Sequence, residues 1–105
     1  MIKEIALNVP KEKLSEFCRK WQIKELSLFG SVLTENFSND SDIDVLVSFS
    51  AGAEHTLFDL VRMEEELNRI FGRKVDLVSR RGIESSRNYV RRDAILKTAE
   101  SIYVT

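Results

Sequence analysis

The chain has 105 residues, which is enough for one domain with a hydrophobic core and too few for two. A hydrophobic share of 43% and a charged share of 31% are typical of an ordinary globular protein. The net charge of −1 argues against the broad affinity for nucleic acid or membranes that strongly basic proteins show.

The cysteine content and the absence of long apolar runs bear on location. Cys18 is the only cysteine, so an internal disulfide is ruled out and a reducing compartment is expected. It shares one face of a predicted helix with Leu14, Phe17 and Trp21, so we expect a core residue and not a nucleophile. The start of the chain lacks a signal-peptide core, and no apolar run reaches membrane-spanning length. We therefore expect a cytoplasmic protein with no membrane partner.

The first half of the chain alternates between helix and strand signals. Pro10 suits a first helical turn, and Gly30 is expected to end a strand. The clearest strand signal is the period-two alternation of apolar residues from Ile43 to Phe49. These signals predict a helix over 10–21, a strand over 24–29, a short helix over 31–37 and a strand over 43–49.

The second half continues the alternation. Thr56 followed by Asp59 is a weak variant of the capping box, and Gly72 is a good C-terminal stop. We expect a helix over 56–71, a strand over 74–78, a helix over 83–99 and a short extended tail over 102–105. The apolar face of the first of these helices is predicted to consist of Leu57, Leu60, Val61, Leu67, Ile70 and Phe71. The order of elements predicts a single α/β (α+β) domain over 1–105, with a small mixed sheet flanked by helices.

Three aspartates stand out against this pattern. Asp42 and Asp44 are two residues apart at one strand end, so both side chains share a face and repel each other unless a cation lies between them. Asp76 is the only polar side chain between Val75 and Val78, in a strand that we expect to be central. A carboxylate there must be neutralised, hydrogen-bonded or metal-bound. If the two strands are neighbours, the three carboxylates converge on a site that suits Mg²⁺.

Gly30 and Ser31 supply a second feature of the expected site. A glycine at a strand-to-helix turn lets the backbone approach a ligand, and a helix N-terminus with a hydroxyl beside it favours phosphate. Each feature has a plain alternative: an ordinary turn, a surface strand end, or a core Asp76 paired with Arg73 or Arg80. The combination, at these spacings, favours a metal-assisted transfer of a phosphoryl or nucleotidyl group.

The sequence resembles a known family. The segment GSVLTENFSNDSDIDVLVSF matches the Gly-Ser, ten residues, Asp-x-Asp signature of polymerase-β-type nucleotidyltransferases, and KVDLV supplies their third aspartate. The helix TLFDLVRMEEELNRIFG leading into KVDLV, and the ending YVRRDAILKTAESIYV, resemble the minimal nucleotidyltransferase (MNT) group. The resemblance spans nearly the whole chain.

The resemblance implies a specific chemistry. Gly30 and Ser31 would hold the β- and γ-phosphates of ATP, and Asp42 and Asp44 would bridge two Mg²⁺ ions. Asp76 would bind the catalytic metal and help to deprotonate the attacking hydroxyl. MNT proteins typically act as antitoxins to a HEPN-domain toxin, some by attaching AMP to a tyrosine of it. The resemblance therefore predicts a Mg²⁺-dependent nucleotidyltransferase antitoxin with a HEPN partner.

Two other functions stay open: a binding-only antitoxin that occludes the toxin, and a nucleotidyltransferase that modifies a small molecule such as an antibiotic. About 29 residues follow Asp76, too few for a separate acceptor domain. We therefore expect the acceptor surface to come from a partner protein or from self-association, as a homo- or hetero-oligomer.

The C-terminal region is rich in arginine, namely Arg80, Arg81, Arg87, Arg91 and Arg92. These side chains could neutralise a triphosphate, contact an acidic toxin face, touch RNA or simply be solvated. Direct nucleic-acid binding is not expected, because no aromatic residues are interleaved with them as a stacking platform. Tyr89 and Tyr103 are expected to be core or interface residues, and no role is assigned to His55.

Overall fold

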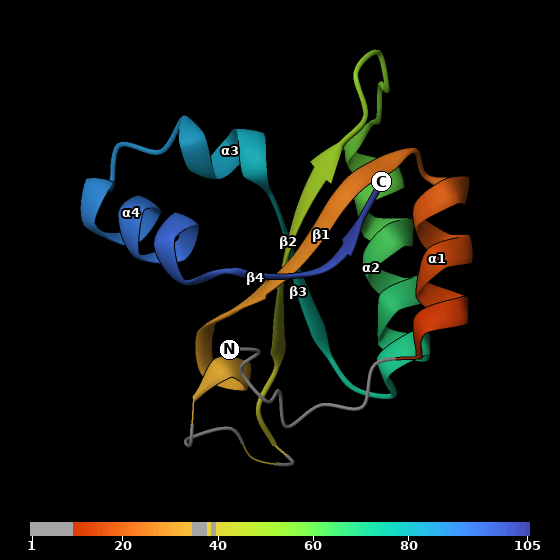
Figure 1. Ribbon diagram of the computed structural model, residues 1–105, viewed down its shortest axis with the longest axis horizontal. Helices are drawn as coiled ribbons and strands as arrows, with labels where there is room; N and C mark the ends of the chain where they lie inside the picture. The colour runs from red at the N-terminus through yellow and green to blue at the C-terminus, as the bar shows by residue number, and fades with distance from the viewer. Residues whose placement is uncertain (1–9, 35–37, 39) are drawn as a thin grey trace.

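The computed structural model describes residues 10–34, 38 and 40–105. Within these ranges the chain forms helices on both sides of one sheet (Figure 1). In chain order the elements are α1 (Lys11–Lys20), β1 (Ile23–Phe29), the 3₁₀ turn η1 (Gly30–Leu33), β2 (Ile43–Phe49), α2 (Leu57–Phe71), β3 (Val75–Ser79), α3 (Arg80–Glu84), α4 (Tyr89–Thr98) and β4 (Glu100–Val104). No helix among the described residues is long and apolar enough to cross a membrane.

The four strands of these ranges form one mixed sheet in the order β3-β2-β1-β4. β1 pairs antiparallel with both β2 and β4, whereas β2 and β3 run parallel. Helices α1 and α2 lie on one side of the sheet, and α3 and α4 lie on the other (Figure 1). The predicted fold class, a small mixed sheet flanked by helices, is therefore confirmed. The expectation that the strand carrying Asp76 is central is wrong, because in the described sheet β3 pairs with β2 alone and so lies at an edge.

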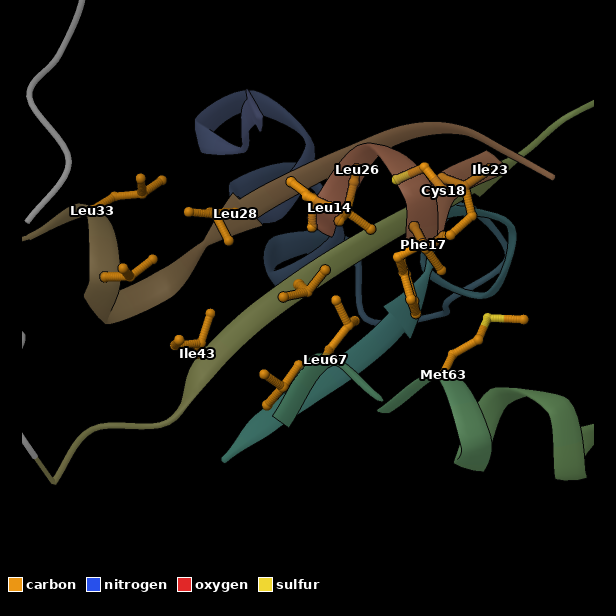
Figure 2. Packing of buried hydrophobic residues seen from close by; sticks show 14 residues of the cluster. Leu14, Phe17, Cys18, Ile23, Leu26, Leu28, Leu33, Ile43, Met63 and Leu67 are labelled. Atoms are coloured by element: carbon orange, nitrogen blue, oxygen red, sulfur yellow. The ribbon is translucent and has the colours of Figure 1, made fainter. Parts of the chain in front are cut away.

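The larger core lies between the sheet and the first two helices. The face of β2 that carries Ile43, Val45 and Val47 packs there, as its alternation predicts (Figure 2). Cys18 is fully buried in the same cluster, and burial raises the pKa of its thiol to about 12. Such a thiol carries almost no thiolate at neutral pH, so Cys18 is a core residue.

The predicted apolar face of α2 is only partly right. Leu60, Met63 and Leu67 follow helical spacing and pack on the sheet, with Met63 and Leu67 fully buried. Val61 is exposed because it lies about 100° around the helix from Leu60. Leu57 is also exposed, at the first residue of the helix.

The ends of α2 form as predicted. The Thr56 side chain accepts a hydrogen bond from the backbone N–H of Asp59, and the Asp59 carboxylate accepts one from the N–H of Thr56, at 3.2 and 2.9 Å. This reciprocal pair is a complete capping box. Gly72 ends the helix with a φ of 70°, in the left-handed region that glycine adopts without strain.

The second face of the sheet carries a smaller core. Its buried members are Phe29, Leu46, Ile83 and Ile95. The single helix predicted over 83–99 is in fact two helices, α3 and α4, separated at 85–88. The break has a local cause, since Asn88 caps a new helix by accepting a hydrogen bond from the Arg91 N–H at 3.1 Å. The predicted extended tail is confirmed as β4, which begins at Glu100.

Candidate active site

Three carboxylates lie at the N-terminal ends of β2 and β3. Asp44 and Asp76 are direct partners in the parallel register, so their backbones are about 5 Å apart. Asp42 immediately precedes β2 and points to the same side as Asp44, by the two-residue period of an extended chain. Their odd-numbered neighbours Ile43 and Val75 are buried in the larger core, so the carboxylates face the side of α3 and α4. Of the three predicted aspartates, Asp44 and Asp76 therefore lie side by side, and Asp42 is near enough for its charge to act on Asp44.

The three carboxylates differ in environment. Asp42 and Asp76 are exposed, and Asp44 is half-buried between them and the sheet. Burial raises the pKa of Asp44, the negative charges of Asp76 and Asp42 raise it further, and the positive charge of Arg91 opposes them. Asp76 lies on the exposed edge strand, so the expectation of a buried carboxylate in need of neutralisation is wrong for this residue. The repulsion centres on Asp44.

Side chains of α2 hold the edge strand that carries Asp76. The backbone N–H of Val75 donates to the Asn68 side-chain oxygen at 2.7 Å, and that of Leu77 donates to a Glu64 carboxylate oxygen at 3.1 Å. These two bonds fix the strand on either side of Asp76. They also occupy backbone groups that an open sheet edge would otherwise offer to another chain.

Gly30 packs directly against the half-buried carboxylate. Phe29 is the register partner of Asp44, and Gly30 follows it with a φ of 78°. A Cβ at this position would overlap Oδ2 of Asp44 and lie 3.3 Å from its Cγ. Gly30 is therefore required both by its left-handed backbone and by the close approach of the Asp44 side chain.

Ser31 lies in a turn that the larger core anchors. Val32 and Leu33, the next two residues, are buried there, and the Ser31 carbonyl accepts bonds from the N–H and the hydroxyl of Thr34, both at 2.9 Å. Of the helix predicted over 31–37, the described part is a single 3₁₀ turn that ends at Leu33, and positions 35–37 lie outside the described residues. A phosphate here would meet the backbone and hydroxyl of Gly30 and Ser31 without the dipole of a long helix.

The donor set suits Mg²⁺. Among the residues that the structure describes, no three acidic, His or Cys side chains are arranged to enclose an ion. Mg²⁺ does not need such a cage, since it is usually bound through one or two carboxylates, completed by waters and substrate phosphates. Asp44 beside Asp76, with Gly30 and Ser31 next to them, provides carboxylate oxygens and a place for phosphate. The chemistry of Asp44 and Asp76 therefore fits Mg²⁺, and a bound cation would also relieve the repulsion around Asp44.

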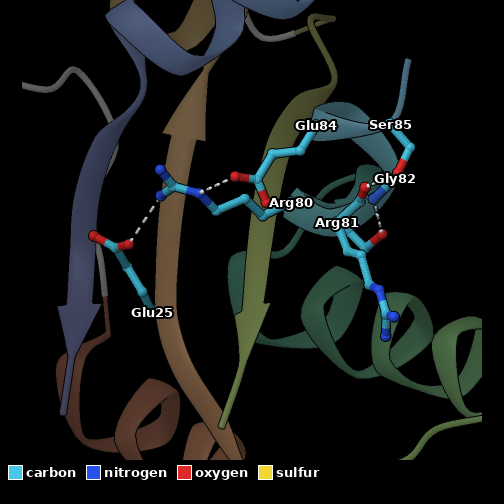
Figure 3. A network of polar contacts seen from close by, with 7 residues as sticks. Glu25, Arg80, Arg81, Gly82, Glu84 and Ser85 are labelled. Atoms are coloured by element: carbon cyan, nitrogen blue, oxygen red, sulfur yellow. Dashed lines mark hydrogen bonds and ion pairs between the residues drawn. The ribbon is translucent and has the colours of Figure 1, made fainter. Parts of the chain in front are cut away.

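The C-terminal arginines make different contacts. Arg80 reaches Glu25 on β1 at 3.4 Å and Glu84 on α3 at 3.9 Å (Figure 3). Arg92 lies 4.7 Å from the ring centroid of Tyr89. Arg91 is the arginine whose charge acts on Asp44. The sequence does not distinguish Arg91 from the other four arginines, but in the structure Arg91 lies one helical turn before the buried Ile95 and so on the side of α4 toward the sheet.

His55 is a structural residue that the sequence analysis left without a role. Its ring packs on those of Phe49 and Trp21, at centroid distances of 4.5 and 5.9 Å, and its Nε2 lies 2.8 Å from the Trp21 carbonyl oxygen. These contacts close the end of β2 opposite the carboxylates. The pairing could not be read from the sequence, because it joins three separate segments.

Comparisons with known proteins agree with this geometry. The family model described as "Nucleotidyltransferase domain" matches residues 10–100. Protein adenylyltransferase MntA of Thermococcus cleftensis is 32% identical over 82 residues, which cover 78% of this chain and 78% of the relative. The five predicted site residues, Gly30, Ser31, Asp42, Asp44 and Asp76, all lie within the segment that the family model spans.

Two solved structures share the fold. "Structure of putative minimal nucleotidyltransferase" superposes with a TM-score of 0.65 at 32% identity and covers 86% of each chain. A chain in the complex of tri-AMPylated Shewanella oneidensis HEPN toxin with MNT antitoxin superposes with a TM-score of 0.60, covering 90% of this chain and 70% of that one. Its identity of 20% limits that likeness to the fold. By family match, identity and fold, the chain belongs to the nucleotidyltransferase domain family, in its minimal nucleotidyltransferase branch.

Proposed function

We propose that the protein transfers AMP from ATP to a hydroxyl group, that of a tyrosine, on a HEPN-domain toxin and so neutralises it in the cytoplasm. The observation that carries this proposal is the register of Asp44 opposite Asp76, with Gly30 packed against Asp44. The name of the matched relative, a protein adenylyltransferase, and the fold match within a HEPN–MNT complex both support a protein acceptor.

The chain's own residues have distinct tasks in this reaction. Gly30 and Ser31 bind the β- and γ-phosphates through their backbone and hydroxyl groups. Two Mg²⁺ ions, held by Asp42, Asp44 and Asp76, would offset the charge of the triphosphate and stabilise the attacking and leaving oxygens. The positive charge of Arg91 adds to the binding of the triphosphate.

The transfer is a single displacement at the α-phosphorus. The acceptor oxygen forms a bond to this phosphorus, and the bond from the phosphorus to the bridging oxygen of pyrophosphate breaks. The hydroxyl proton passes to Asp76, whose exposed position on the edge strand leaves it open to a protein substrate. The products are an AMP-modified acceptor and pyrophosphate.

The test is to incubate the protein with ATP, Mg²⁺ and the HEPN partner and to measure the partner's mass. We expect a mass increase of one or more AMP groups, which disappears with Asp44→Asn and persists with Glu65→Gln, an exposed carboxylate change on α2. An unmodified partner under every metal and nucleotide tested would exclude AMP transfer to it. If Asp44→Asn still neutralises the toxin as well as the parent, the protein acts by binding alone. Modification of an antibiotic instead of the partner would identify a small-molecule enzyme.

A further inference from the structure

Two exposed apolar patches remain on the described surface after the two cores are assigned. One patch, on the first turns of α2, consists of Leu57, Phe58 and Val61, whose exposed fractions are 79%, 80% and 55%. The other, on the first turn of α4, consists of Tyr89 and Val90, at 63% and 83%. Large apolar side chains grouped at one exposed place often mark an interaction site.

The two patches lie at different distances from the carboxylates. The α2 patch follows the end of β2 that contains Phe49, which His55 contacts, whereas Asp44 is at the other end. Six residues of extended chain separate these ends by roughly 17–20 Å. The α2 patch is therefore remote from the reacting groups.

The α4 patch lies beside the carboxylates. Ile95 of α4 packs with Phe29 and Leu46, and Phe29 is the register partner of Asp44. Arg91 is one helical turn before Ile95 on the same side of the helix, and its charge reaches Asp44. Tyr89 and Val90 immediately precede Arg91, so the first turn of α4 borders the site.

The charges around the two patches are opposite. Residues 80–98 hold six Arg or Lys and two Asp or Glu, whereas residues 54–66 hold one Arg and five Asp or Glu. Among the described residues Arg87 makes no ion pair, and the Tyr89 ring is held by the Arg92 guanidinium 4.7 Å away. The α4 patch is therefore an apolar surface in a positive setting, with a fixed aromatic ring, the composition that interface centres favour.

We propose that the first turn of α4, through Tyr89 and Val90, is where the acceptor protein docks, and that it receives an apolar side chain flanked by acidic residues next to the acceptor hydroxyl. This proposal rests on the proposed function, because it names the surface that brings the acceptor to that site. The positive residues from Arg80 to Lys97 surround this patch, so it is complementary in charge to an acidic segment of the acceptor protein.

The test compares Val90→Asp with Phe58→Asp, which places the same charge at an equally exposed residue of the α2 patch. Both variants should keep the parent's melting temperature, since neither side chain is buried. With the purified HEPN partner, Val90→Asp should raise the KM for the partner about tenfold and leave the KM for ATP unchanged. Phe58→Asp should change neither value. Arg87→Glu should also raise the KM for the partner, and Arg87→Lys should restore it.

The same variants are compared in a direct binding measurement with the partner and no ATP. Weaker binding by Val90→Asp, with Phe58→Asp unaffected, supports docking at α4. Equal binding by Val90→Asp and the parent overturns the proposal, as does a loss confined to Phe58→Asp. If the parent binds the partner without modifying it, the proposed catalysis fails while this comparison still decides the docking surface.

Discussion

The two faces of the sheet differ sharply in how much they bury. Among the residues that the structure describes, 14 buried hydrophobic side chains form the cluster on the side of α1 and α2, and four form the cluster on the side of α3 and α4. The second side also carries Asp42, Asp44 and Asp76. Burial of apolar area is the main source of folding stability, so most of it comes from the first side. The second side can then hold repelling carboxylates and exposed apolar residues at a cost that the first side offsets.

The turn after β1 connects the two sides. Val32 and Leu33 are buried in the large cluster, and Gly30, two residues earlier, touches Asp44 on the other face. The well-packed side thus fixes the position of the turn that contains Gly30 and Ser31. We expect substitutions on the side of α1 and α2 to change mainly stability, and those on the side of α3 and α4 to change mainly activity. The following three predictions test this.

The largest effect is expected at Gly30. Gly30→Ala places a Cβ where the Asp44 carboxylate lies, on a backbone with a φ of 78°, so Asp44 must rotate away. Misplacement of a reacting group by about 1 Å can cost about 100-fold in rate, and we expect at least this loss of AMP transfer. The measurement is the initial rate of partner modification under saturating ATP and Mg²⁺.

Gly52→Ala is the matched control for this substitution. Gly52 has a φ of 85°, but a Cβ there would meet no atom within 4 Å. Gly52→Ala should therefore lose only about 1–2 kcal/mol of folding free energy, the cost of an alanine in the left-handed region, and its transfer rate should be unchanged. Equal rates for the two variants would show that the contact between Gly30 and Asp44 does not matter for the reaction.

The second prediction compares the two clusters. Leu67→Ala empties a fully buried position under α2 and should lower the free energy of unfolding by about 2–5 kcal/mol. Ile95→Ala, in the smaller cluster, should cost about 2 kcal/mol, because α4 can shift to fill the space. That shift moves Arg91, so Ile95→Ala should lose more transfer activity than Leu67→Ala when both are assayed well below their melting temperatures. Denaturant titration measures the free energy of unfolding, and the transfer assay measures activity. A larger loss of activity for Leu67→Ala than for Ile95→Ala would contradict the assignment of stability to one face and activity to the other.

The elements that the sequence predicts correctly are those with a local cause. The alternation of Ile43, Val45 and Val47 and the capping pair of Thr56 and Asp59 depend on residues close in the chain, and both are present in the structure. The contact between Gly30 and Asp44 comes instead from the antiparallel pairing of β1 with β2, in which Phe29 is the partner of Asp44. The fold class follows from these elements in order.

What could not be predicted depends on how distant segments pair. Strand β3 lies at an edge because β2 pairs with β1 on its other side and the last strand, β4, joins β1 and not β3; on this edge strand Asp76 is exposed. The selection of Arg91 from five arginines depends on the packing of Ile95 against Leu46. Helical periodicity likewise assigned Val61 to the core, because the sheet covers only a narrow strip of α2.

The smallest of the three effects concerns the charge on Asp44 in metal-free buffer. Burial and the charges of Asp76 and Asp42 raise its pKa, so the folded protein holds this proton more tightly than the unfolded chain does. The stabilisation from Asp44 is therefore complete below the pKa of an unfolded aspartate, about 3.9, and is lost as the pH rises through the raised value. Asp44→Asn does not ionise and escapes this loss. In EDTA at neutral pH Asp44→Asn should melt at a higher temperature than the parent, with the difference vanishing as the pH falls below about 4.

The control variant, Glu65→Gln, should show no such trend with pH. Addition of Mg²⁺ and ATP should raise the melting temperature of the parent but not that of Asp44→Asn. A lower melting temperature for Asp44→Asn at neutral pH in EDTA would mean that the carboxylate supports the fold instead of straining it.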